Sequence, residues 1–122
     1  MTDVSHLSSA TALSARREMA MLPRLLKSGE DVLDVCHGSV GGRAAVVVVT
    51  DRRVVFIQRR RFWGADVESV PLARVRSADE RIGVRHATVV LDAGGRSYEL
   101  SDVDRALAET FCARLRARLS AS

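Results

Sequence analysis

The residues best suited to contacting a ligand form one cluster, directly after a valine-rich stretch in the middle of the chain. Arg59, Arg60 and Arg61 are followed by Phe62 and Trp63. Arginine can bind phosphate through two parallel hydrogen bonds, and exposed aromatic rings can enter a membrane interface or stack on bases. The cluster therefore predicts contact with anionic lipid or a phosphorylated ligand, at about 1 kcal/mol for each arginine near a membrane.

The same cluster also has a structural interpretation. Side chains of a strand alternate between its two faces, so Arg59 and Arg61 would point to one side and Arg60 to the other, as solvated strand ends. Phe62 or Trp63 would then cover a barrel end or pack against the N-terminal segment. We favour this interpretation, because a lone Trp in a small barrel is more often buried than exposed, and we keep ligand contact as the alternative.

Patterns typical of catalysis or metal binding are missing from the sequence. His6, His37 and His86 are scattered, and Cys36 and Cys112 stand far apart with no CxxC motif. The chain contains no HExxH, P-loop or GxSxG motif. We therefore expect no enzyme activity, no catalytic residues, no cofactor and no metal, and we expect the cysteines to be small buried side chains in a reducing cytosol.

Composition indicates one soluble domain with an N-terminal appendage. The 122 residues are 47% hydrophobic and carry a formal net charge of +4. This charge is well below the positive charge typical of a dedicated nucleic-acid binder. The N-terminus lacks the long apolar core of a signal peptide, and no stretch is long enough for a membrane span. We expect a cytoplasmic protein, peripheral at the inner face of the membrane if the lipid alternative holds. Nucleic-acid binding through the cluster at residues 59–63 is a third and less favoured hypothesis.

Residues 1–28 are predicted to be a tail followed by a short or kinked helix. Residues 12–27 have apolar side chains at helical spacing, and Pro23 interrupts them because proline lacks an N–H and clashes with the preceding turn. We expect this helix to pack on its own domain or on a second copy, with an amphipathic membrane helix as the alternative. The apolar positions are Leu13, Met19, Leu22, Leu25 and Leu26.

The sequence of the remaining residues, 29–122, predicts seven antiparallel strands and a C-terminal helix at 102–119. Four consecutive valines at 46–49 indicate that both faces of the second strand are covered. The helix shows an apolar stripe at four-residue spacing, and Ser101 to Asp104 fits a capping box at its start. The predicted strands are 32–36, 43–50, 52–60, 66–72, 74–82, 87–91 and 96–100.

Three motifs in this order resemble the bacterial pleckstrin-homology-like (PH-like) domains of the YokE type. They are Gly-Glu-Asp-Val-Leu at 29–33, Val-Val-Thr-Asp-Arg-Arg-Val-Val-Phe at 48–56 and Val-Pro-Leu-Ala-Arg-Val at 70–75. The resemblance implies a mainly β (α+β) fold, a seven-stranded antiparallel barrel or two packed sheets capped by a C-terminal helix. It implies no activity. It gives the shared motifs structural roles, with Thr50 and Asp51 setting a hairpin turn and Arg53 pairing with a carboxylate.

The resulting prediction is a non-catalytic interaction module that binds another protein or a second copy of itself. The alternative is a peripheral binder of anionic lipid or a phosphorylated ligand. In eukaryotic PH domains, phosphoinositide affinity comes from basic residues in the first hairpin loop and the loop between the third and fourth strands. Here the first loop carries only Arg43. The candidate contact residues are therefore Arg43, Arg59, Arg60, Arg61, Phe62 and Trp63.

Overall fold

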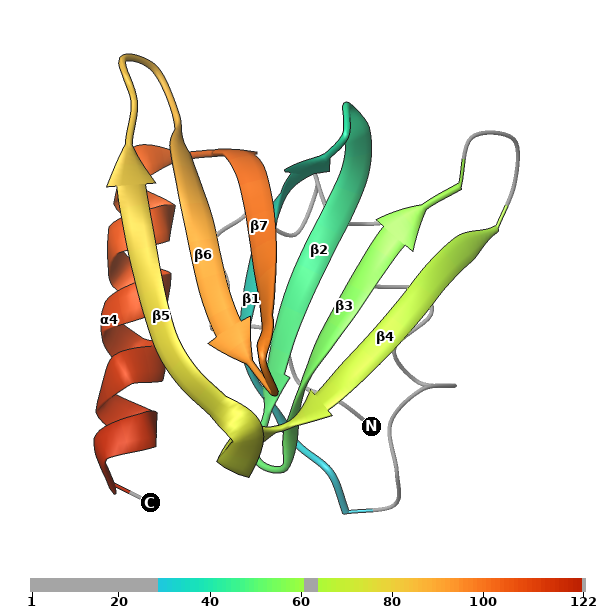
Figure 1. Ribbon diagram of the computed structural model, residues 1–122, viewed down its shortest axis with the longest axis vertical. Coiled ribbons are helices and arrows are strands. Elements are labelled where there is room, and N and C mark those ends of the chain that lie inside the picture. The colour runs from blue at the N-terminus through green and yellow to red at the C-terminus, as the bar shows by residue number, and fades with distance from the viewer. Residues whose placement is uncertain (1–28, 61–63, 122) are drawn as a thin grey trace.

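The fold is an antiparallel β-structure closed by one C-terminal helix, which confirms the predicted fold class (Figure 1). The structure is a computed structural model, which describes residues 29–60 and 64–121. The predicted helix at 12–27 and the candidate residues Arg61, Phe62 and Trp63 lie outside the described residues. The elements are β1 (Val32–Val40), β2 (Arg43–Thr50), β3 (Arg53–Arg59), β4 (Ala65–Pro71), a short 3-10 helix (Leu72–Arg74), β5 (Val75–Ile82), β6 (Ala87–Ala93), β7 (Arg96–Val103) and α4 (Arg105–Ala121).

The sheet consists of two halves that face each other. Its strand order is β4-β3-β2-β1-β7-β6-β5. The halves meet where Ser39 of β1 pairs with Ser101 of β7, and stacking of Phe56 of β3 on Tyr98 of β7 shows that β1–β4 lie opposite β5–β7. Among the described residues, β4 pairs only with β3 and β5 only with β6. Both are therefore edge strands, and Pro71 at the end of β4 is tolerated there.

The valine run of β2 is buried on both faces, as predicted. Val47 and Val49 belong to an inner cluster between the two halves and α4, whereas Val46 and Val48 belong to a separate outer cluster. Because alternate residues of a strand point to opposite faces, the outer cluster lies on the side of β1–β3 that turns away from β5–β7 and α4. The outer cluster consists of Val32, Val35, Val46, Val48, Val55 and Ile57.

The helix α4 lies alongside β5 and closes the inner cluster (Figure 1). Phe111 and Leu115 are buried in that cluster, while Leu107 and Leu119 are partly buried against it, which confirms the predicted apolar stripe. Arg116 ties the helix to β5, donating to the Ala78 carbonyl at 2.8 Å and to the Glu80 carboxylate at 2.9 Å.

The predicted start of the helix at residue 102 is wrong. The helix begins at Arg105, and its N-cap is Asp104, whose carboxylate accepts the Leu107 N–H at 3.0 Å. Ser101 remains in β7, and Val103 pairs with Ala87 of β6. The capping-box pattern at 101–104 was therefore placed three residues too early, because β7 continues to Val103 before the helix begins.

Several predicted strands are too short or shifted by one residue. β1 does not end before Gly38 but continues through it to Val40. Gly38 lies where β1 meets β7, and a Cβ at this position would lie 2.3 Å from the Ser101 carbonyl oxygen. This glycine therefore permits close backbone packing inside a strand and does not end one.

Candidate functional site

An open groove lies between the two halves of the sheet. It has a volume of about 420 Å³ and is lined by residues of β1–β4, β6 and β7. Its apolar floor comes from the inner cluster, with Val47, Val89, Leu91 and Leu100 among its residues. A cavity of this size with a mainly apolar lining fits one or two side chains of a partner.

Two aromatic rings meet in the groove. Phe56 of β3 and Tyr98 of β7 stack with ring centroids 4.1 Å apart and planes 9° apart. Such pairs contribute about 0.5–1.5 kcal/mol beyond the area they bury. The Arg96 guanidinium lies 5.2 Å from the Tyr98 ring centroid and extends the stack. Both rings therefore form part of the groove lining.

The carboxylate of Glu68 on β4 closes one corner of the groove. It accepts hydrogen bonds from the Tyr98 hydroxyl at 2.8 Å and from Arg96 Nη1 at 2.6 Å. Partial burial and this carboxylate together raise the pKa of Tyr98 above its usual value. The contact ties edge strand β4 to β7, so the groove keeps its shape while the outer side of β4 stays unpaired among the described residues.

Edge strand β4 runs along the groove. Asp66, Val67 and Glu68 line the groove, and Val67 is 41% exposed. An extended peptide could pair with this strand and place alternate side chains toward the groove, as in strand addition. Strand addition at an exposed sheet edge is expected for a PH-like barrel. The sequence did not reveal the groove beside the edge, since Phe56, Glu68 and Tyr98 come from three separate strands.

The described residues of the predicted arginine cluster lie at one end of the sheet. Ala45 pairs with Gln58, which brings Arg43 at the start of β2 to the same end as Arg59 and Arg60. Arg60 is exposed and forms an ion pair with Asp66 at 2.9 Å. Arg59 is partly buried and Arg43 is exposed. Their contact with a ligand stays a prediction.

An exposed apolar tip lies at this same end. The turn between β5 and β6 extends beyond the strands (Figure 1), and Val84 in it is 95% exposed, with Ile82 at 45%. Arg81 and Arg85 flank Val84 in the sequence. No sequence pattern marks this tip, because a single valine in a turn has no periodicity.

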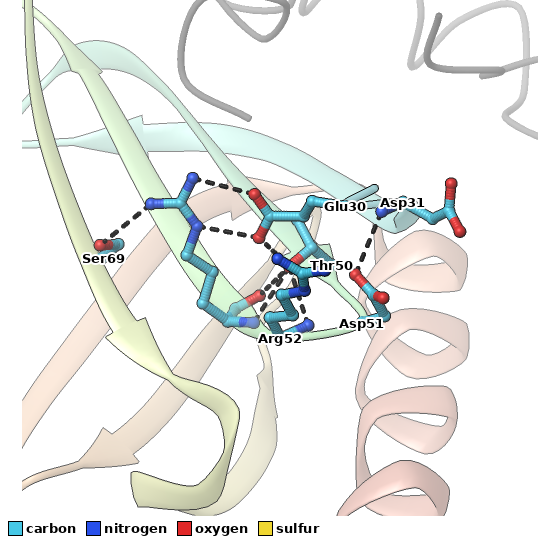
Figure 2. Close-up of polar contacts among 7 residues, drawn as sticks. Glu30, Asp31, Thr50, Asp51, Arg52 and Ser69 are labelled. Carbon is cyan, nitrogen blue, oxygen red and sulfur yellow. Dashed lines mark hydrogen bonds and ion pairs between the residues drawn. The ribbon is translucent and has the colours of Figure 1, made fainter. Parts of the chain in front are cut away.

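A buried polar cluster fixes the start of β1 against the β2–β3 turn (Figure 2). The Glu30 carboxylate accepts hydrogen bonds from Arg53 Nε at 2.9 Å and from the Thr50 hydroxyl at 2.7 Å. Thr50 Oγ1 also accepts the N–H groups of Arg52 and Arg53, and Asp51 accepts the Asp31 N–H. The turn role of Thr50 and Asp51 and the carboxylate partner of Arg53 are thereby confirmed.

The described residues contain neither a candidate metal site nor a reactive thiol. No group of three or more His, Cys, Asp or Glu side chains there could hold a metal ion. Cys36 and Cys112 are free and buried, and burial raises the pKa of each thiol far from the range of a nucleophile. None of the helices described has the length and apolar character that a membrane crossing requires.

Seven antiparallel strands folded into two facing halves, with one helix closing the core after the last strand, define the PH-like fold. The chain belongs to the bacterial PH domain family, which it matches over residues 26–117. PH domains are in general interaction modules. The YokE type, which the motifs resemble, is a narrower assignment within PH-like domains.

Two solved structures share the fold. The pleckstrin homology domain from Shewanella amazonensis SB2B has a TM-score of 0.56 and 18% identity, with 81% of this chain and 95% of that chain covered. The pleckstrin homology domain of USP37 has a TM-score of 0.55 and 14% identity, with 72% and 98% covered. A search of the curated proteins found no match.

Proposed function

We propose that this domain is a non-catalytic module that binds an extended segment of another protein along β4. The observation that carries the proposal is the apolar groove of about 420 Å³ beside an edge strand that has no second partner among the described residues. Backbone pairing would supply affinity, and the groove would select an apolar side chain. The three motifs at 29–33, 48–56 and 70–75 support placing the domain in the YokE type. A cytoplasmic location is part of the same proposal.

A peptide library displayed on phage tests this proposal without a known partner. Asp66→Trp should block the site, because Asp66 is exposed and lines the groove. Asp79→Trp is the matched control, since Asp79 is an exposed residue of the other edge strand, β5. Selected peptides should carry an apolar residue and should bind the wild type and Asp79→Trp alike. They should bind Asp66→Trp about tenfold more weakly or worse, equivalent to about 1.4 kcal/mol.

The position of the bound peptide is then read by NMR. Cross-strand contacts between peptide backbone protons and β4, at Val67, are the expected result. Peptides that bind Asp66→Trp as well as the wild type, or that contact β5, would contradict the proposal. If the wild type itself sediments as a dimer and Asp66→Trp as a monomer, the partner segment is β4 of a second copy.

The arginine end supports a second candidate function, the peripheral binding of anionic lipid. Arg43, Arg59 and Arg60 lie at the end of the molecule from which the exposed Val84 extends. An apolar tip beside positive charge is suited to a headgroup interface. In this candidate, Arg61, Phe62 and Trp63 join the same surface. The protein would then sit at the inner face of the membrane.

A further inference from the structure

The outer cluster is buried although it lies on the outside of the sheet. Val35, Val48, Val55 and Ile57 have 0% exposed surface. The buried apolar residues of α4 belong to the inner cluster, and Ala65 is the one partly buried apolar residue, among those described, that packs on the outer cluster. Side chains on an outer sheet face reach such burial only when a further layer of atoms covers them.

The chain enters β1 from this outer side. Thr50 follows Val46 and Val48 at two-residue spacing on β2, and Arg53 precedes Val55 in the same way on β3, so both belong to the outer face. The Glu30 side chain, with 0% exposed surface, binds both Arg53 and Thr50. Glu30 therefore lies over the end of the outer face, and Gly29, the first described residue, precedes it in the chain.

We propose that residues 12–27 of the same chain cover the outer cluster and form a third layer of the domain. The segment has the required composition, since Leu22, Leu25 and Leu26 share the apolar side of its predicted helix while Arg24 lies on the other. With the interruption at Pro23, sixteen helical residues would span at most about 24 Å, within the ~27 Å length of an eight-residue strand such as β2. The segment ends at Lys27, three residues before the Glu30 anchor, so it needs no long connection.

Contacts between methyl groups test this placement on the unmodified chain of 122 residues. With Leu, Val and Ile methyls carrying 13C, nuclear Overhauser effects are expected between Leu22, Leu25 or Leu26 and the outer valines Val48 and Val55. Inner-cluster leucines and valines provide the positive control in the same spectrum. If no leucine of residues 12–27 contacts an outer valine, the proposal is overturned.

A second copy is the competing occupant. In a mixture of labelled and unlabelled protein, isotope-filtered spectra detect contacts between molecules only. Signals between the segment and the outer valines in that mixture would show that the segment crosses to another copy, and would also overturn the proposal.

Paired substitutions give an independent readout. Leu25→Asp should speed amide hydrogen exchange in β2 and β3 about tenfold or more, as expected when a leucine can no longer be buried. Arg24→Asp introduces the same residue one position earlier, on the polar side, and should change exchange by less than about threefold. Equal effects of the two substitutions would contradict the proposed packing.

Discussion

At the scale of single residues, Glu30 and Asp66 show how burial decides the value of an ion pair. Arg53–Glu30 and Arg60–Asp66 have the same Nε to carboxylate distance of 2.9 Å. The first pair has exposed side-chain fractions of 18% and 0%, and the second 57% and 64%. Removing one partner of a buried pair leaves the other charge without compensation, whereas exposed pairs contribute little.

We therefore expect Glu30→Ala to lower the free energy of unfolding by about 3 kcal/mol, and Arg60→Ala by less than about 1 kcal/mol. Urea unfolding of both variants measures the difference. Glu30→Gln should fall between them, because it keeps a hydrogen-bond acceptor and loses the charge. Similar losses for Glu30→Ala and Arg60→Ala would show that the Glu30 cluster does not anchor β1.

The two cysteines give a second prediction at this scale, on pH. Burial, followed by the Glu80 carboxylate, raises the pKa of Cys112 to about 12, and burial likewise raises the pKa of Cys36. Because the thiolate is the reactive form, iodoacetamide at pH 8 should label neither cysteine until the protein unfolds. Rapid labelling of the folded protein at pH 8 would contradict this.

The raised pKa of the thiols in the folded protein also contributes stability. This stability is fully present below about pH 8.5, the pKa in the unfolded chain, and is lost as the pH rises through the folded pKa.

At the scale of elements, the start of α4 shows where local sequence signals are insufficient. Both Ser101 and Asp104 are good N-cap residues, and the sequence pattern favoured Ser101. The structure uses Asp104, because β7 continues to Val103, which pairs with Ala87 of β6. Asp104→Ala should therefore cost about 1 kcal/mol of stability in thermal or urea unfolding. Ser101→Ala, the control, should cost less than about 0.5 kcal/mol. A larger loss for Ser101→Ala than for Asp104→Ala would identify Ser101 as the N-cap instead.

Gly38 gives the second prediction for an element, the β1–β7 junction. A Cβ here would lie 2.3 Å from the Ser101 carbonyl oxygen and 2.9 Å from side-chain atoms of Leu100 and Val103. Backbone cannot move aside as a flexible side chain can, so Gly38→Ala should cost about 3 kcal/mol or prevent folding. Gly41→Asn is the control, because Gly41 has φ +58° and open space around it, and asparagine tolerates that conformation. Equal stability of the two variants, in urea unfolding or in soluble yield, would argue against a tight junction.

At the scale of the whole molecule, the fold was more predictable than the site. Strand periodicity, the glycine turns and the apolar stripe of the helix are local signals, and they predicted seven strands and one helix in the right order. The groove depends on residues brought together over long separations: Glu68 binds Arg96 and Tyr98, which follow it by 28 and 30 positions. No local pattern marks such a meeting of strands, whereas the arginine cluster was visible because its residues are adjacent.

The distribution of charge over the molecule gives the last prediction, which tests the lipid candidate. Arg59 and Arg60 lie at the end from which Val84 extends, while Arg76 at the start of β5 and Arg118 in the last turn of α4 lie at the opposite end (Figure 1). Replacing Arg59 and Arg60 by Ala and Val84 by Ser should weaken binding to vesicles with 30% phosphatidylserine about 30-fold or more, since two arginines contribute roughly 2 kcal/mol.

Replacing Arg76 and Arg118 by Ala removes the same charge from the other end and serves as the matched control. Co-sedimentation at low and high salt measures both variants, and binding that depends on arginine should weaken as salt rises. If the two variants lose binding equally, net charge and not the arginine end is responsible. If the wild type does not bind these vesicles at all, the lipid candidate is rejected and the β4 groove remains the proposed binding site.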